Sequence, residues 1–240
     1  MAAAIEIHPM MTFSILDLVA LGMYLIAWTA YAIILDHTAY GANSLNRLMH
    51  RYREDWMRQM IRREMRMLDG QVSASLQNGT AFFASSSLIA LGGALALFHS
   101  SGDILSLVNA LPFGVVPTRV QWEAKTAGLA VILVYAFFKF AWSYRLYNYV
   151  AMMLGAAPPA SERDSATAQE FVVRASLLCA DAGRQFNRGQ RAFFFALAYL
   201  GWFVGPLPFL VTTAGVMVVM WRRQFNSSAR QSISAPPQAS

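Results

Sequence analysis

The sequence has few charged residues, two lysines and one cysteine, and these shortages narrow the possible classes of protein. Asp, Glu, Lys and Arg make up 13% of the 240 residues, whereas about 25% is usual in a soluble domain. This shortage of charge, together with 56% hydrophobic residues, indicates a membrane protein. The single cysteine, Cys179, excludes an intrachain disulfide. A cleavable signal peptide is not expected, because no Lys or Arg precedes the first long apolar stretch.

Motifs that carry several kinds of catalysis are also missing. The sequence contains no Gly-x-Ser-x-Gly, no phosphate-binding P-loop and no His-Glu-x-x-His. A haem between membrane helices needs two histidines at similar depth, but His37 and His99 are expected at opposite ends of their spans. The sequence therefore predicts no catalytic residue, no metal site and no cofactor.

Four apolar segments are long enough to cross a bilayer, which takes about 20 residues. They lie at about residues 18–35, 79–98, 126–148 and 192–221. The second is rich in small residues, which let helices approach closely in lipid, so we expect it to be an inner helix. The fourth is broken by Pro206 and Pro208. We interpret it as one bent span, because a hairpin at residues 205–208 would leave only about 12 apolar residues on each side.

Two segments between the spans have helical spacing of apolar residues, and the first of them has a strongly basic opposite side. They lie at about residues 44–68, which contain seven arginines, and 163–186. Each is expected to lie on lipid headgroups or to pack under the bundle. Nucleic-acid binding is not expected, because no recognised motif accompanies the arginines. The predicted class is all-α: an integral membrane four-helix bundle with two cytoplasmic amphipathic helices, forming one domain over residues 1–225, followed by a disordered tail at residues 226–240.

The positions of the basic residues predict an orientation. With four spans, twelve arginines fall in the two amphipathic loops and five Lys or Arg residues fall on the other side. Because Lys and Arg are retained in the cytoplasm, both amphipathic segments are expected there and both termini in the periplasm.

Polar residues gather where the predicted spans meet the cytoplasm. Charged groups near hydrocarbon are usually paired or functional, and helix N-termini favour anions. One hypothesis is a basic pocket for a phosphate-bearing group, most simply a lipid head group. The alternative is a structural network in which Asp36 neutralises Lys139 or Arg145. The candidate anion- or lipid-binding residues are Asn78, Lys139, Arg145, Asn148, Asn187, Arg188, Gln190 and Arg191, with Asp36 as the ion-pair candidate.

Three stretches carry a resemblance to a known family. They are SLQNGTAFFASSSLIALGGALAL (residues 75–97), FFKFAWSYRLYNY (residues 137–149) and FNRGQRAFFFALAYLGWFVGP (residues 186–206). In these the chain resembles the bacterial membrane-protein family catalogued as domain of unknown function 599. The resemblance implies a multi-pass protein of the inner membrane of a Gram-negative bacterium, and it implies no established activity.

Three functions are compatible with these features. The first is a non-enzymatic scaffold or accessory subunit whose partners are membrane lipids or another protein. The second is a small transporter or channel, which would need to be a homo-oligomer because four spans alone make a thin pore. The third is an enzyme acting on a lipid phosphate through the cationic cluster.

Overall fold

A computed structural model describes residues 13–99 and 117–234, and every regular element in those ranges is helical. The predicted all-α class is therefore confirmed. The elements are α1 (Ile15–His37), η1 (Gly41–Asn43), α2 (Leu45–Met60), α3 (Met67–His99), α5 (Arg119–Gly155), η2 (Ala160–Glu162), α6 (Ala166–Tyr199), α7 (Gly201–Val204), α8 (Pro206–Phe225) and α9 (Ser228–Ser234).

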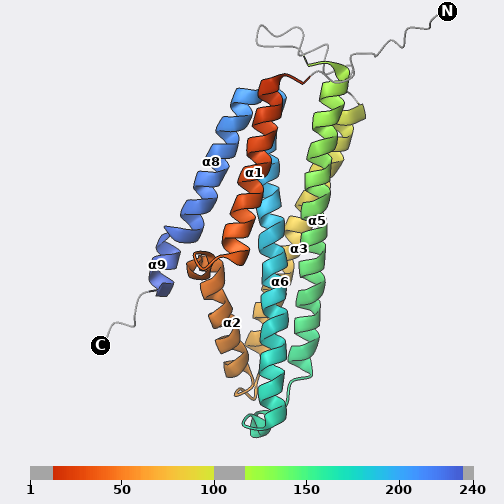
Figure 1. Ribbon diagram of the computed structural model, residues 1–240. Helices are drawn as coiled ribbons and strands as arrows, with labels where there is room; N and C mark the ends of the chain where they lie inside the picture. Colours follow the sequence, from red (N-terminus) through yellow and green to blue (C-terminus); the bar gives the residue numbers. More distant parts are fainter. Residues whose placement is uncertain (1–12, 100–116, 235–240) are drawn as a thin grey trace, which may run out of the picture.

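The helices lie side by side along one long axis (Figure 1). Helices α3, α5 and α6 run along the whole length, whereas α1 and α8 occupy one half and α2 the other (Figure 1). We call the first the apolar half and the second the arginine-rich half. The apolar half comprises residues 13–40, 79–99, 117–140 and 187–225, and the arginine-rich half comprises residues 41–78 and 141–186.

Three helices, α1, α3 and α5, are long and apolar enough to cross a membrane. They contain the first three predicted spans. Helices α3 and α5 have 33 and 37 residues, or about 50 and 55 Å at 1.5 Å per residue. Because the hydrocarbon core is about 30 Å thick, both helices are long enough to continue well beyond it.

The fourth predicted segment, residues 192–221, is not one bent helix. Helix α6 ends at Tyr199, the single turn of α7 follows, and α8 begins at Pro206. Helix α8 then returns alongside α6, since the Thr212 hydroxyl donates to the Ala198 carbonyl at 2.7 Å and Arg223 lies over the ring of Phe194. The single-span prediction was wrong, and this part of the chain is a helical hairpin.

The physical reason lies in where the prolines fall. Pro206 is in the first turn of α8, where a missing backbone N–H costs nothing. Gly205 has φ = +157°, a conformation that favours glycine. The prolines therefore start a new helix. A hairpin was not expected because each side of the turn has only about 12 apolar residues. The helix that follows the turn, α8, nevertheless has 20 residues and is about 30 Å long.

The two halves have different cores. In the apolar half, aromatic rings from α1, α6, α7 and α8 pack together, with Trp28 stacked on Phe195 at 5.0 Å and Trp202 on Phe209 at 5.3 Å between ring centroids. In the arginine-rich half the core is mainly Met, Leu, Val and Ala from α2, α5 and α6. Its fully or nearly fully buried members include Met57, Met60, Val150, Val172, Ala175, Cys179 and Ala182.

Helix α3 is not an inner helix, contrary to our prediction. It packs chiefly against α5, and few residues of its apolar window are buried. Apart from the backbone of α3 and the adjacent residues, no atom of the described residues lies within 4 Å of where a Cβ would project from Gly79, Gly92 or Gly93. Small residues permit close approach but do not specify a neighbour, so their presence did not determine the position of this helix.

The two predicted amphipathic segments pack against each other rather than lying separately. The first corresponds to α2, which ends at Met60, and the second forms the beginning of the continuous helix α6. The predicted disordered tail at residues 226–240 begins with the short helix α9, and residues 235–240 lie outside the described residues.

Candidate functional site

A cavity of about 380 Å³ lies where the two halves meet. It is bordered by the end of α1, the first turn of α2, the middle of α6 and the end of α8. The lining residues are Tyr31, Leu35, Asp36, Ser44, Leu45, Asn46, Arg47, His50, Arg184, Asn187, Arg188, Gln190, Arg191, Phe194, Met220, Arg223 and Gln224. We call this cavity the arginine pocket.

The arginine pocket has a large excess of positive charge. Among the described residues, five arginines from three helices line it, and Asp36 is its one lining carboxylate. The three arginines of α6 are Arg184, Arg188 and Arg191, whose spacing of four and three residues places them on one side of that helix. The sequence of α6 thus presents three guanidinium groups to the same cavity.

Asp36 neutralises only part of this charge. Its Oδ2 atom accepts from Arg188 Nε at 3.3 Å and from Arg191 Nη2 at 3.3 Å. The partners of Asp36 are therefore arginines of α6, and not Lys139 or Arg145 as the structural-network alternative supposed. Because one carboxylate oxygen is shared between two guanidinium groups, neither arginine is fully paired.

Arg191 is the most deeply placed of these arginines. Its side chain is 7% exposed, and among the residues that the structure describes its buried Nη1 atom has no hydrogen-bond partner. The guanidinium also lies over the ring of Tyr31, 5.9 Å from the centroid. A buried donor without a partner costs free energy, so Arg191 has an unused donor beside the pocket.

The first turn of α2 completes one wall. Ser44 is its buried N-cap, and the Ser44 hydroxyl accepts from the Arg47 amide at 3.4 Å. A neighbouring amide, that of Asn46, donates to the side-chain oxygen of Gln224 at 3.4 Å. The N-terminus of this 16-residue helix therefore adds partial positive charge to the pocket.

His50 faces the same cavity from the second turn of α2. Burial, together with the positive charges of Arg53, Arg184 and Arg47, lowers the pKa of His50 to about 4, while Asp181 acts in the opposite direction. The imidazole is therefore neutral at pH 7.

The predicted candidates divide into two groups. Asn187, Arg188, Gln190 and Arg191 line the arginine pocket together with Asp36, whereas four other candidates do not. Those four are Asn78, Lys139, Arg145 and Asn148, on α3 and α5. Helix α6 contacts α5 and also α8 and α2.

The residues outside the pocket have other surroundings. Asn78 is exposed and Asn148 is half-buried. Lys139 lies over the ring of Tyr135. Arg145 is exposed and donates to the Tyr149 hydroxyl at 2.6 Å.

Several lining residues were not predicted from the sequence. Arg223 was expected on the opposite side of the membrane, because the hairpin was not predicted. Arg47 and Arg184 were counted only among the arginines of the basic loops, and His50 was not predicted as a site residue. The spacing of Arg184, Arg188 and Arg191 was a usable signal for a shared helix side.

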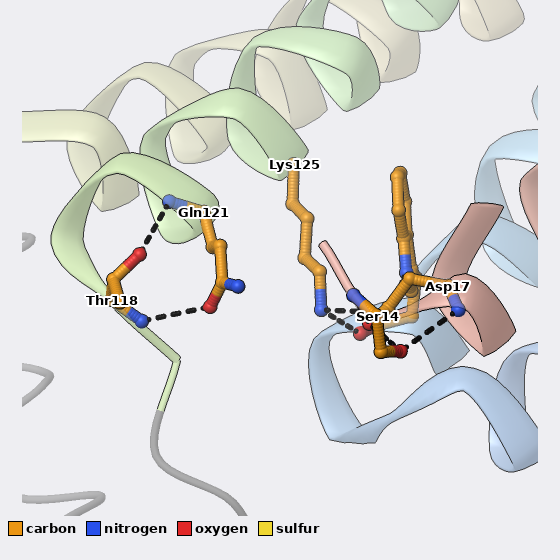
Figure 2. A network of polar contacts seen from close by, with 6 residues as sticks. Ser14, Asp17, Thr118, Gln121 and Lys125 are labelled. Carbon is orange, nitrogen blue, oxygen red and sulfur yellow. Dashed lines mark hydrogen bonds and ion pairs between the residues drawn. The ribbon is translucent and has the colours of Figure 1, made fainter. Parts of the chain in front are cut away.

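A second polar network lies at the far end of the apolar half. Asp17 accepts from Trp202 Nε1 at 2.7 Å, and Lys125 donates to the Trp202 carbonyl at 2.8 Å. Figure 2 shows Lys125 extending from α5 toward Ser14 and Asp17 at the start of α1, with 3.9 Å between Lys125 Nζ and Asp17 Oδ1. Each charged group has a partner, which indicates a structural role in joining α1, α5 and α7.

The arginine-rich half has its own buried carboxylate. Asp69 is fully buried and accepts from Trp56 Nε1 and Arg63 Nη1, both at 2.7 Å. These contacts hold the beginning of α3 against α2. In the same half, burial raises the pKa of the Cys179 thiol, which lowers the reactivity of that cysteine.

Comparison with known proteins identifies the family. Residues 19–229 match the family described as protein of unknown function, DUF599. The chain belongs to this family. The match confirms the resemblance noted in the sequence and extends over the hairpin and both halves. No curated protein and no solved structure matches the chain, so the arginine pocket is the main guide to what this DUF599 protein does.

Proposed function

We propose that this DUF599 protein is a multi-pass protein of the bacterial inner membrane that binds a phosphate-bearing anionic group in the arginine pocket. The simplest source of such a group is the head group of an anionic lipid, and the protein would then act as a lipid-dependent scaffold or accessory subunit. The observation that carries the proposal is the buried, partly unpaired Arg191 within a cavity lined by four more arginines.

The hairpin also changes the expected orientation. Because α8 returns toward α2, Arg222, Arg223 and Arg230 join the other basic residues. The division of twelve basic residues against five becomes fifteen against two, the two being Arg119 and Lys125. The positive-inside rule then favours a cytoplasmic arginine-rich half, with the start of α1 outside and the end of α8 inside.

The orientation can be tested with reporters fused after Arg230. A reporter that is active only in the cytoplasm should be active, and one that needs the periplasm should be inactive. The reverse result would contradict the hairpin orientation and return the C-terminus to the periplasm, as expected for a single bent span.

The binding proposal can be tested by native mass spectrometry of the purified full chain. We expect retained anionic lipid in the wild type and much less in Arg188→Ala. Arg145→Ala is the matched control, since it removes an exposed arginine outside the pocket. Equal lipid retention in all three proteins would exclude the arginine pocket as the binding site.

A further inference from the structure

The arginine pocket has features that bear on the chemistry of its ligand, beyond the proposed function on which they rest. We infer that the pocket selects a phosphate monoester over a phosphate diester. A monoester carries a charge of about −1.5 to −2 at pH 7 and has three terminal oxygens. A diester such as the link in a common lipid head group carries a single negative charge and has two non-bridging oxygens.

The charge balance of the pocket favours a dianion. Five arginines and one carboxylate line the cavity, and the carboxylate, Asp36, is 28% exposed. Arg184 also pairs with Asp181 outside the lining, so about three guanidinium charges have no compensating carboxylate within residues 13–99 and 117–234. A ligand with one negative charge would leave most of this positive charge uncompensated in a partly buried site. A dianion gains more from the same groups, because the interaction of charges scales with their product.

The donors of the pocket come from several directions. Arg191 and Arg188 border it from α6, Arg223 from α8, and Arg47 with the first turn of α2 from a third side. The buried Nη1 of Arg191 has no hydrogen-bond partner. Donors on three sides of the pocket can bind the three terminal oxygens of a monoester. A diester has only two such oxygens, because two of its four oxygens form ester links.

The N-terminus of α2 also favours a charged hydrogen-bond acceptor over an uncharged one. The amide of Asn46 is already engaged by an uncharged oxygen, that of Gln224. Hydrogen bonds with an ionised acceptor are roughly twice as strong as neutral ones. A phosphate oxygen is therefore a better acceptor at this helix N-terminus than the amide it would replace.

A lipid and a soluble metabolite can both supply a phosphate monoester. Leu35, Phe194 and Met220 give the pocket an apolar wall beside the charged one. An acyl chain or a small organic group can each rest on such a wall. Phosphatidic acid represents the lipid source in the experiment, and glycerol 3-phosphate represents the soluble source.

The experiment uses the full chain in phosphatidylcholine nanodiscs containing a small, equal fraction of phosphatidic acid or of phosphatidylglycerol. Native mass spectrometry then measures the bound lipid. We expect retention of phosphatidic acid to exceed that of phosphatidylglycerol by roughly tenfold, the effect of about one additional charge-assisted hydrogen bond. If glycerol 3-phosphate displaces bound phosphatidic acid, the natural ligand of the pocket is a soluble monoester. If it does not, the natural ligand is a lipid.

Neighbouring arginines of α8 provide a matched pair of variants. Arg223 lines the pocket, and Arg222, next to it on the same helix, does not. Arg223→Gln should reduce the preference for phosphatidic acid, and Arg222→Gln should leave it unchanged. Arg191→Lys tests the buried site itself, because lysine keeps the charge and loses the planar fork. Its fold is checked by the elution profile and helical content.

The outcomes separate the inference from the proposed function. Equal retention of both lipids would overturn the monoester preference and leave anion binding intact. No retention of either lipid and no binding of glycerol 3-phosphate would overturn the proposed function as well. Equal losses in Arg222→Gln and Arg223→Gln would show general surface attraction and would contradict a defined site.

Discussion

The apolar and arginine-rich halves share three helices but are held together by different means. In the apolar half, large rings interlock and two tyrosine hydroxyls donate to carbonyls, Tyr24 to Phe195 and Tyr31 to Met220. In the arginine-rich half, small aliphatic side chains pack around Met57 and Met60. Packing and hydrogen bonds can hold helices together even where apolar burial supplies no driving force, as in lipid, whereas an aliphatic core relies on the driving force that burial has in water.

The pocket lies where these two kinds of core end. The aromatic core ends near Tyr31 and Phe194, and the aliphatic core begins near α2. Near this boundary a smaller cluster around Phe140 and Ala192 joins α5 to α6, and the arginines surround a cavity beside it. A cavity at this boundary is partly shielded from water and can still be reached by a charged ligand.

The largest expected effect is the loss of a central ring from the apolar half. Phe195 is fully buried and touches the rings of Tyr24 and Trp28. Phe195→Ala should destabilise the protein by about 3–5 kcal/mol, measured by unfolding in mixed micelles. Phe138→Ala is the control, since that ring is 64% exposed. Similar losses in both variants would contradict a packed aromatic core.

The next effect concerns the ion pair at the end of the apolar half that is far from the arginine pocket. Asp17→Asn keeps the size of the side chain but leaves Lys125, whose side chain is 9% exposed, without its carboxylate. We expect a loss of about 1–3 kcal/mol, measured by the same unfolding assay. Asp164→Asn is the control, because the Asp164 side chain is 84% exposed. An unchanged stability for Asp17→Asn would show that the pair does not hold α1 to α5.

A smaller loss is expected where α2 meets α6. A Cβ on Gly183 would lie 2.7 Å from Arg53 Nη2 and 2.9 Å from its Cζ, so Gly183→Ala must displace that arginine. Because the displaced atoms are the end of a flexible side chain, and Ala is favoured over Gly inside a helix by about 0.5–1 kcal/mol, the expected net cost is below about 1 kcal/mol, with faster proteolysis of α2. Gly70→Ala, where no atom lies within 4 Å of the new methyl group, should be neutral or slightly stabilising. Equal behaviour of the two variants would count against close α2–α6 packing.

The last prediction concerns the pH dependence that His50 gives to the stability of the protein. Since the folded-state pKa of His50 is lowered to about 4 from its usual 6.5, the unfolded chain binds more protons between these values. Stability from this residue is complete above about pH 6.5 and falls as the pH drops toward 4. Unfolding of the wild type should show this slope, and His50→Gln should reduce it. An identical slope in the variant would exclude His50 as its source.

The sequence was sufficient for the all-helical class and for three spans, because these depend on local apolar length. It was not sufficient for the hairpin, since Pro206 can either bend a helix or begin one, and the choice depends on Thr212 and Ala198 meeting across the turn. The same limit affected the site. Arg188, Arg191 and Asp36 were found from their positions near predicted span ends, but Arg223 could join them only once α8 was known to return.

The small residues of α3 were also ambiguous evidence for the position of that helix in the bundle. Gly92 and Gly93 would suit an inner helix, and they are equally compatible with a helix at the edge of the bundle. Which of these holds is decided by how α5 packs against α6, which depends on contacts far apart in the chain. A periodic pattern identifies a helix and its apolar side, but not its neighbours.

The uninterrupted course of α6 has a mechanical consequence. This helix has 34 residues, about 51 Å of rigid rod, and it carries three of the pocket arginines near its middle. If α6 turns as one body about its axis, Arg184, Arg188 and Arg191 move together, and the end near Ser165 and the end near Tyr199 turn with them.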